Sequence, residues 1–199
     1  MFKKYILSVL ITSGLSCKDG VDYYDVPLTS ANNYYHAVIE IPAGTNKKFE
    51  YRRDSNTFEI DIKDGKERII EFLPYPGNYG YIPSTYSDPK KQGDGDALDV
   101  LVLSESLATG TIVEIIPVAM LKLIDDGEID YKIIAIPADQ KSQVVSVKSL
   151  KELDDSFPEV KAIIELWFLN YNKHDEASIE GWGNEVEAVE EIIKNKKQQ

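Results

Sequence analysis

Residues 93–103 read GDGDALDVLVL, an acidic loop that runs directly into an apolar segment typical of a buried strand. The loop brings Asp94, Asp96 and Asp99 within six residues of one another. Two carboxylates about 4 Å apart repel by about 4 kcal/mol at an effective dielectric constant of about 20, so the cluster needs a positive charge. A hard cation such as Mg²⁺ supplies it, because it prefers carboxylate oxygens and leaves positions open for water or phosphate oxygens.

The three acids converge only if the backbone bends. In an extended chain Asp94 and Asp96 share one face, whereas Asp99 points to the other. Gly95 permits the bend, because glycine adopts backbone conformations that other residues avoid. A solvated acidic loop ahead of a strand is the alternative interpretation of an Asp-x-Asp pattern, and the rest of the sequence favours a metal site.

Length and charge limit the function classes. With 199 residues and 43% hydrophobic content, the chain is long enough for one domain with a substantial core. A net charge of -12 argues against nucleic acid or an anionic membrane surface as the main partner. It does not argue against a phosphate substrate, because bound Mg²⁺ would invert the local field.

The N-terminal sequence has the layout of a secretory signal peptide. Two lysines precede an apolar run at 5–11, which is too short to span a membrane, and small residues follow. The ending Leu15-Ser16-Cys17 resembles a bacterial lipoprotein signal, in which cleavage leaves Cys17 lipidated, although Gly14 stands where a larger aliphatic residue is usual. An ordinary N-terminal helix with a buried Cys17 is the alternative.

These features predict the organisation and the location of the chain. We expect a signal peptide at 1–16, a polar tether at 17–33 and a single domain at 34–199. The domain would be held at a bacterial cell envelope, on the periplasmic side or the cell surface, and would meet the membrane only through a lipid on Cys17. Without processing of the signal, the protein would be cytoplasmic.

Strand patterns fill the first two thirds of the chain. Alternating or β-branched segments predict strands at 34–41, 48–52, 58–62, 133–136 and, as one long or two short strands, 111–123. Glu40 is a charged residue within the first of them, so it lies at an edge or faces a site. The segment 71–83 carries three prolines and two glycines, and we expect a fixed aromatic loop there rather than a central strand.

The segment 124–132 is expected to form a hairpin. With a loop at 126–129, Asp125 and Asp130 would face each other, and like charges directly opposed destabilise a hairpin. Either a second metal-binding edge or a splayed, solvated turn resolves this conflict.

Helical patterns appear only in the last third. Ser156 and Glu159 have capping-box spacing and precede an apolar stripe from Val160 to Tyr171. Asn184 is expected to cap a final helix that begins with acids and ends with Lys194.

Seven segments taken together resemble the soluble, Mg²⁺-dependent inorganic pyrophosphatases of family I. The resemblance extends over 38–182 and is specific because the order and spacing agree throughout. The matching segments are 39–43 (IEIPA), 48–50 (KFE), 75–81 (YPGNYGY), 94–96 (DGD), 98–100 (LDV), 125–132 (DDGEIDYK) and 180–182 (EGW). It implies an α+β, mainly β fold, a five-stranded closed barrel of the oligonucleotide-binding (OB-like) type with flanking α-helices, and hydrolysis of pyrophosphate to two phosphates.

The resemblance also implies the site residues. Several Mg²⁺ ions would be bound, with Mn²⁺ or Zn²⁺ as substitutes, by Asp94, Asp99, Asp125 and Asp130. Asp96 would act as general base on the attacking water, with Asp125 beside it in the catalytic machinery. The phosphate oxygens would be held by Lys48, Arg68, Tyr79, Lys132 and Tyr171, while the cavity would also be lined by Glu40, Glu50 and Tyr75.

Two residues depart from the family pattern. Ala97 replaces a Pro or Glu, which matters little if that side chain binds no metal. Asn172 follows Tyr171 where a lysine is frequent, so one phosphate-binding cation is expected to be missing or replaced by Lys173.

Two other functions stay open at the level of sequence. One is a non-catalytic, metal-dependent phosphate or polyphosphate-binding lipoprotein of the envelope, which Asn172 and the expected location would suit. The other is hydrolysis of another phosphoanhydride. We expect a homo-oligomer, because family members associate.

Overall fold

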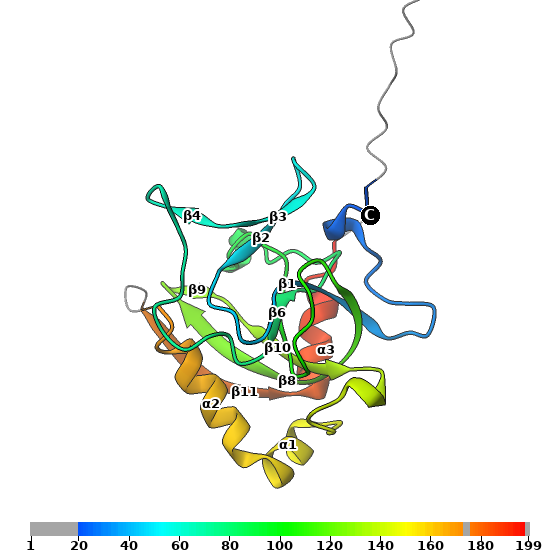
Figure 1. Cartoon of the computed structure of the whole chain (residues 1–199). Coiled ribbons are helices and arrows are strands. Elements are labelled where there is room, and N and C mark those ends of the chain that lie inside the picture. The colour runs from blue at the N-terminus through cyan, green and yellow to red at the C-terminus, as the bar shows by residue number, and fades with distance from the viewer. Residues whose placement is uncertain (1–19, 173–175, 198–199) are drawn as a thin grey trace, which may run out of the picture.

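A ring of five strands forms the centre of the molecule. The computed structural model describes residues 20–172 and 176–197. The ring closes because β1 pairs with both β6 and β8, and its members in pairing order are β1 (Tyr35–Ile41), β6 (Asn78–Tyr81), β7 (Asp99–Val102), β10 (Lys132–Pro137) and β8 (Ile112–Asp125) (Figure 1). β7 and β10 are parallel, whereas the other neighbours in the ring are antiparallel. The expected mainly β fold with a five-stranded ring is confirmed.

The remaining strands lie outside the ring. β8 continues beyond it to pair with one more long strand and one short one, and two hairpins stand apart from the main sheet (Figure 1). These strands are β11 (Ala177–Asn184) and β9 (Glu128–Ile129) beside β8, the hairpin of β2 (Phe49–Arg52) with β3 (Thr57–Ile60), and the hairpin of β4 (Ile62–Lys63) with β5 (Lys66–Glu67).

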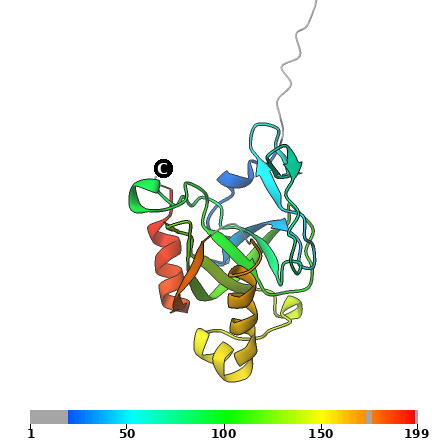
Figure 2. The same cartoon turned by 90° about the vertical axis from the view of Figure 1, so that its left-hand side faces the viewer.

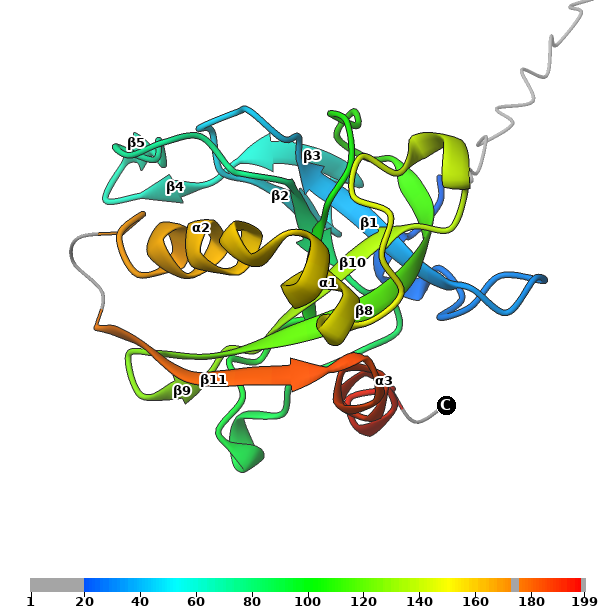
Figure 3. The ribbon, with the colours of Figure 1, turned by 90° about the horizontal axis from the view of Figure 1, so that it is seen from below.

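Helices flank the ring on two sides. α1 (Leu150–Ser156) and α2 (Pro158–Phe168) lie on one side of β8, and α3 (Glu185–Lys194) lies at the end of β11 on the other (Figures 2 and 3). Three short 3₁₀ turns complete the described chain: η1 (Tyr23–Asp25), η2 (Pro89–Lys91) and η3 (Gln140–Ser142). Within the described residues, none of the helices has the length and apolar character needed to cross a membrane.

The apolar run after the acidic loop is buried on both faces. Leu101 belongs to the core cluster that also contains Trp167 of α2, whereas Val100 packs in the cluster that contains Ile192 of α3. Successive residues of a strand point to opposite faces, so one strand serves both clusters. Both faces of β7 are therefore dry, which explains its unbroken run of Val and Leu.

The expectation of a loop throughout 71–83 is wrong, because β6 (Asn78–Tyr81) is a ring strand between β1 and β7. The prolines lie outside its four residues, so no ladder donor is lost. Gly80 makes the pairing possible, since a Cβ atom there would lie 1.9 Å from the Val38 carbonyl oxygen.

The hairpin after β8 is tighter than expected. Asp126 and Gly127 form a two-residue turn with positive φ angles of 47° and 86°, and Asp125 therefore faces Glu128. The expected Asp125–Asp130 pair is wrong, because an Asp-Gly turn matches the twist of the flanking strands. The like-charge conflict persists with Glu128 as the partner.

The observed N-terminal caps of the helices agree only in part with those predicted from the sequence. Ser156 ends α1 and α2 follows with no side-chain cap, so the predicted capping box of Ser156 with Glu159 is wrong. The first helical turn is instead capped by Ser149, whose Oγ accepts a hydrogen bond from the Glu152 N–H at 3.1 Å. Asn184 caps α3, as predicted, and the structure adds a full capping box with Glu187. The segment 111–123 belongs to one long strand with a register shift beside Pro117.

Part of the expected tether packs on the domain. Val26 is only 6% exposed, and the Ser84 N–H donates to the Tyr24 carbonyl oxygen at 2.9 Å. Tyr24 and Val26 of this segment therefore pack on the domain, whereas the expected signal peptide and Cys17 lie outside the described residues.

The contact at Gly80 predicts a large loss of stability on substitution. Gly80→Ala places a methyl group against the β1 backbone, and we expect destabilisation of about 3 kcal/mol, the upper part of the range for overpacking. Gly127→Ala is the matched control, because its Cβ meets nothing within 4 Å and costs only about 1 kcal/mol of backbone strain. Urea unfolding of both variants measures the difference, and equal losses would contradict the account of β6.

Candidate active site

One cavity is lined by all of the predicted catalytic, metal-binding and substrate-binding residues. It has a volume of about 380 Å³ and lies at the side of the ring that faces the β2–β3 hairpin and the end of α2. Its lining includes Glu40, Lys48, Glu50, Arg68, Tyr75, Tyr79, Asp94, Asp96, Asp99, Asp125, Asp130, Lys132 and Tyr171. Among the predicted residues, Glu40 and Tyr171 are 131 positions apart in the sequence and still line the same chamber.

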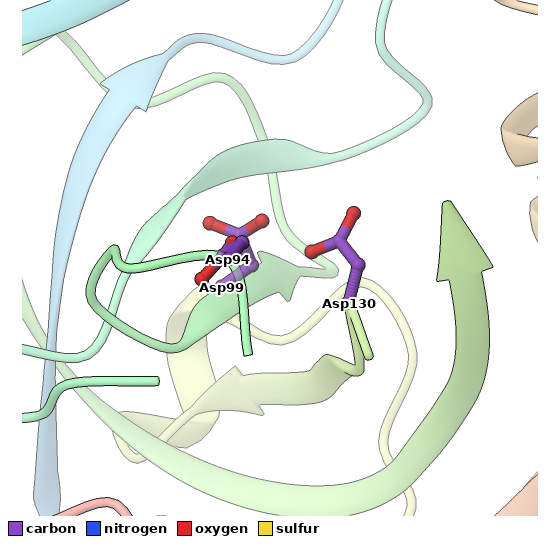
Figure 4. Close-up of side chains that lie close together, drawn as sticks. All are labelled: Asp94, Asp99 and Asp130. Carbon is purple, nitrogen blue, oxygen red and sulfur yellow. The ribbon is translucent and has the colours of Figure 1, made fainter. Parts of the chain in front are cut away.

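Three acids form a compact group in this cavity. Asp94 lies in the loop before β7, Asp99 begins β7, and Asp130 lies between β9 and β10; each offers an oxygen within 4.8 Å of the others (Figure 4). The expected bend is present, since Gly95 has a φ of 89° and the Asp96 N–H donates to Asp94 Oδ1 at 3.0 Å. Asp125 lines the same cavity outside this close group.

A buried lysine sits among the acids. Lys132 is 3% exposed, and its Nζ donates to Asp99 Oδ2 at 2.5 Å and to Asp130 Oδ1. Burial disfavours the ammonium charge, but Asp130 and Asp99 outweigh it and raise the pKa of Lys132. Tyr79 adds a hydrogen bond, donated from its Oη to Asp99 Oδ2 at 2.5 Å.

The group retains excess negative charge. Burial raises the pKa of Asp94 to about 6, and Asp99 and Asp130 contribute to the increase. Burial also raises the pKa of Asp96, again with a contribution from Asp99. An all-oxygen donor set with surplus negative charge fits a hard divalent cation.

Two predicted phosphate-binding cations, Lys48 and Arg68, also line the cavity, and each is paired with an acid. Lys48 Nζ lies 3.2 Å from Glu50 Oε1, and Arg68 Nη1 lies 2.9 Å from Asp61 Oδ2. Arg52, which the sequence reasoning missed, reaches both of these acids at 3.2 and 3.0 Å. These ion pairs orient the cations toward the cavity in the absence of an anionic ligand.

Glu40 lies at the base of the cavity. It is 9% exposed, and its Oε1 accepts a hydrogen bond from the Tyr51 N–H at 2.7 Å. Burial raises the pKa of Glu40 to about 8, despite that hydrogen bond. Glu40 therefore faces the site, and its carboxyl is mostly protonated near neutral pH.

Aromatic rings hold Tyr171, the last of the predicted phosphate-binding residues, in place. Tyr171 stacks on Trp167 with a centroid distance of 4.7 Å and an interplanar angle of 9°. Trp167 is anchored by its Nε1, which donates to the Leu73 carbonyl oxygen at 2.9 Å. The apolar face of α2 thus contributes Trp167 and Phe168 both to the cavity and to the core. Ile163, which was predicted to lie on the same face, is 56% exposed.

Sequence reasoning assigned no site role to several residues that line the cavity. Glu128 could have been found, because the Asp126-Gly127 turn places it opposite Asp125. Tyr24 gave no signal, since it belongs to a polar segment without periodicity. The full set is Tyr24, Tyr51, Arg52, Tyr81, Ala97, Asp126, Glu128, Trp167 and Phe168.

Comparison with known proteins agrees with this geometry. The model of the inorganic pyrophosphatase family matches residues 37–199. The chain belongs to the inorganic pyrophosphatase family. It is similar to the inorganic pyrophosphatase of Neisseria meningitidis serogroup B, with 36% identity over 161 residues that cover 79% of this chain and 84% of that protein. The protein of the same name from Saccharolobus solfataricus is 33% identical over 180 residues, covering 86% and 97%.

Solved structures of the family share the fold. The inorganic pyrophosphatase from Thermus thermophilus superimposes with a TM-score of 0.74 at 29% identity, covering 88% of this chain and 97% of that chain. The one from Schistosoma japonicum gives 0.77 at 30% identity, covering 87% and 69%. The five-stranded ring with its flanking helices is therefore the family fold.

The raised pKa values predict how stability depends on pH and on divalent cations. Asp94 and Glu40 bind protons more tightly in the folded state, so without metal their contribution is present below about pH 4 and is lost as pH rises to about 8. In a chelator, Tm should fall by several degrees between pH 5 and pH 8. Added Mg²⁺ should raise Tm more at pH 8, where the acids are ionised.

Differential scanning calorimetry with EDTA or with Mg²⁺ measures both effects. A Tm in EDTA that rises from pH 5 to pH 8, or a Mg²⁺ effect larger at pH 5, would contradict the account of the acidic group.

Proposed function

We propose that this protein hydrolyses pyrophosphate to two phosphates with Mg²⁺ as its cofactor. The observation that carries the proposal is the cavity itself, which is lined both by the close group of acids Asp94, Asp99 and Asp130 and by the cations Lys48 and Arg68. These cations would bind a substrate of high negative charge, and Mg²⁺ held by the acids would neutralise that substrate further. Family membership and relatives named inorganic pyrophosphatase support the same activity.

The acids would hold the divalent cations and accept the proton of the attacking water. Asp94, Asp99 and Asp130 would bind the ions, and Asp125, which lines the same cavity, would add a further carboxylate ligand. Bound divalent ions lower the pKa of a water and stabilise charge on the transferred phosphoryl group. Asp96 accepts the proton of the attacking water as general base, and its raised pKa brings it closer to the working pH.

The cations and phenols stabilise the departing phosphate. Lys48, Arg68 and Lys132 spread the developing negative charge, which is the main protein contribution in phosphoryl transfer. Tyr79 and Tyr171 donate hydrogen bonds from fixed positions. Glu50 pairs with Lys48 and the Tyr75 ring packs on Tyr79, so both help to orient these groups, while Glu40 lines the same cavity.

Steady-state phosphate release from pyrophosphate tests the function. We expect Mg²⁺-dependent turnover, and Asp96→Asn should lower kcat by about 10²- to 10⁴-fold through loss of the general base. Asp139→Asn is the control: Asp139 is an exposed cap of η3 outside the cavity, and Asn can replace its capping role.

The result also separates the alternatives. Mg²⁺-dependent binding of pyrophosphate without turnover would favour the phosphate-binding protein. Faster turnover of polyphosphate or a nucleoside triphosphate than of pyrophosphate would favour another phosphoanhydride as substrate.

Asn172 predicts weakened substrate binding. The residue follows Tyr171, which lines the cavity, and it replaces a cation that family members often carry. Asn172→Lys should lower KM for pyrophosphate several-fold, because one charge-assisted contact is restored. Asn172→Gln serves as the neutral control of similar length. An unchanged KM in the lysine variant would count against a missing cation.

We also propose that the domain is delivered to a bacterial cell envelope. The N-terminal pattern supports cleavage after residue 16, a lipid on Cys17 and an anchor on the periplasmic side or the cell surface. Mass spectrometry of the membrane-associated protein tests this, and an unmodified terminus at Met1 would reject it. The same proposal includes a homo-oligomer, for which analytical ultracentrifugation is the test.

A further inference from the structure

An N-terminal segment forms part of the wall of the catalytic cavity. We call residues 20–28 the strap. Its turn η1 carries Tyr24, and Tyr24 lines the same cavity as the acidic group. The strap is tied to the loop after β6: the Ser84 N–H donates to the Tyr24 carbonyl oxygen at 2.9 Å, and Ser84 Oγ donates to the Val26 carbonyl oxygen at 2.8 Å.

A second set of contacts ties the strap to the β2–β3 hairpin. Arg53 Nε lies 2.6 Å from Asp22 Oδ2, and its Nη2 pairs with Asp25. The Tyr24 ring packs edge-on against Tyr51, with a centroid distance of 5.2 Å. The hairpin also carries Glu50 and Arg52, so the strap is fastened to the element that forms one wall of the site.

The Tyr24 side chain lies beside the loop that carries Asp96. Its ring packs on the cluster that contains Ala97, the residue after Asp96, and both Tyr24 and Asp96 line the cavity. Burial raises the pKa of the Tyr24 phenol, so the phenol stays protonated and can donate a hydrogen bond. Its ring lies 4.8 Å from that of Tyr81. The Tyr81 hydroxyl is buried and has no hydrogen-bond partner among the described residues, which marks this part of the cavity as a place for ordered water.

We propose that Tyr24 is a positioning residue for hydrolysis: its hydroxyl, held in place by the strap, orients the Asp96 carboxylate through a bridging water. The inference rests on the proposed function, in which Asp96 accepts the proton of the attacking water. Tyr24 itself neither gains nor loses a proton during the reaction. It keeps the accepting oxygen of Asp96 aimed at the water instead of at solvent.

The Tyr24→Phe variant tests the proposal, because it keeps the ring and removes only the hydroxyl. Loss of one hydrogen bond should lower kcat by about five- to tenfold. KM and Tm should stay at the wild-type values. The calorimetric Kd for imidodiphosphate, an analogue with a bridging nitrogen, should also stay within about twofold, since the cations that bind phosphate are untouched.

Tyr23→Phe is the matched control. Tyr23 is the neighbouring residue of η1 and packs on Phe58 outside the cavity lining, so its kcat should equal that of the wild type. Equal rates for Tyr24→Phe and the wild type would overturn the proposal. A lower kcat accompanied by a lower Tm or weaker imidodiphosphate binding would also overturn it, because the ring would then act only in packing or binding.

A second measurement tests whether the strap holds Tyr24 in place. Arg53→Glu opposes the acids Asp22 and Asp25 with a like charge and should lower kcat by displacing Tyr24. In the Tyr24→Phe background the same change should have no further effect, because the hydroxyl it displaces is already absent. Additive effects would reject the role of the strap. Absence of phosphate release by the wild-type protein would instead reject the proposed function, so the two failures are distinguishable.

Discussion

The active cavity depends on three carboxylates being held closer together than their charges favour. Asp94, Asp99 and Asp130 offer oxygens within 4.8 Å of one another, and their mutual repulsion opposes folding. Two features resist it. The parallel pair of β7 and β10, with Val100 opposite Ile133 in a dry core, fixes Asp99 at the start of β7 and the start of β10, two residues after Asp130. Lys132 places a buried ammonium between those two acids.

The apolar core of the five-stranded ring thus stabilises a group of acids whose charges repel one another. A divalent cation bound there would remove most of that repulsion. The cations that receive phosphate come from a different place, the hairpin and loop outside the ring. Lys48 and Arg68 are each paired with an acid, Glu50 and Asp61, so they stay oriented before an anion arrives. The strap, at the N-terminal side of the ring in sequence, contributes the Tyr24 phenol to the same cavity. Acids, cations and phenol therefore converge on the cavity from three parts of the chain that are distant in sequence.

Much of this site could be predicted from the sequence. The acidic density at 93–99, next to an apolar run, indicated a metal site at a strand end, and the wider pattern indicated the family fold. The strand at Asn78–Tyr81 was missed because its role depends on Gly80 accepting the β1 backbone at close range, a tertiary contact. Glu128 was missed because the sequence analysis expected a loop at 126–129, whereas the turn has only two residues, Asp126 and Gly127. Tyr24 could not be predicted, because strap packing depends on Arg53 and Ser84, which are distant in sequence.

The central claim is that Asp94, Asp99 and Asp130 form a divalent-cation site beside the phosphate-binding cations. Anomalous X-ray diffraction from crystals grown with Mn²⁺ and phosphate tests it most directly, since manganese scatters anomalously and replaces Mg²⁺ at oxygen sites. The account predicts an anomalous peak in contact with these carboxylates, with phosphate between it and Lys48 and Arg68. Strong manganese peaks elsewhere, with this group of acids empty, would contradict it.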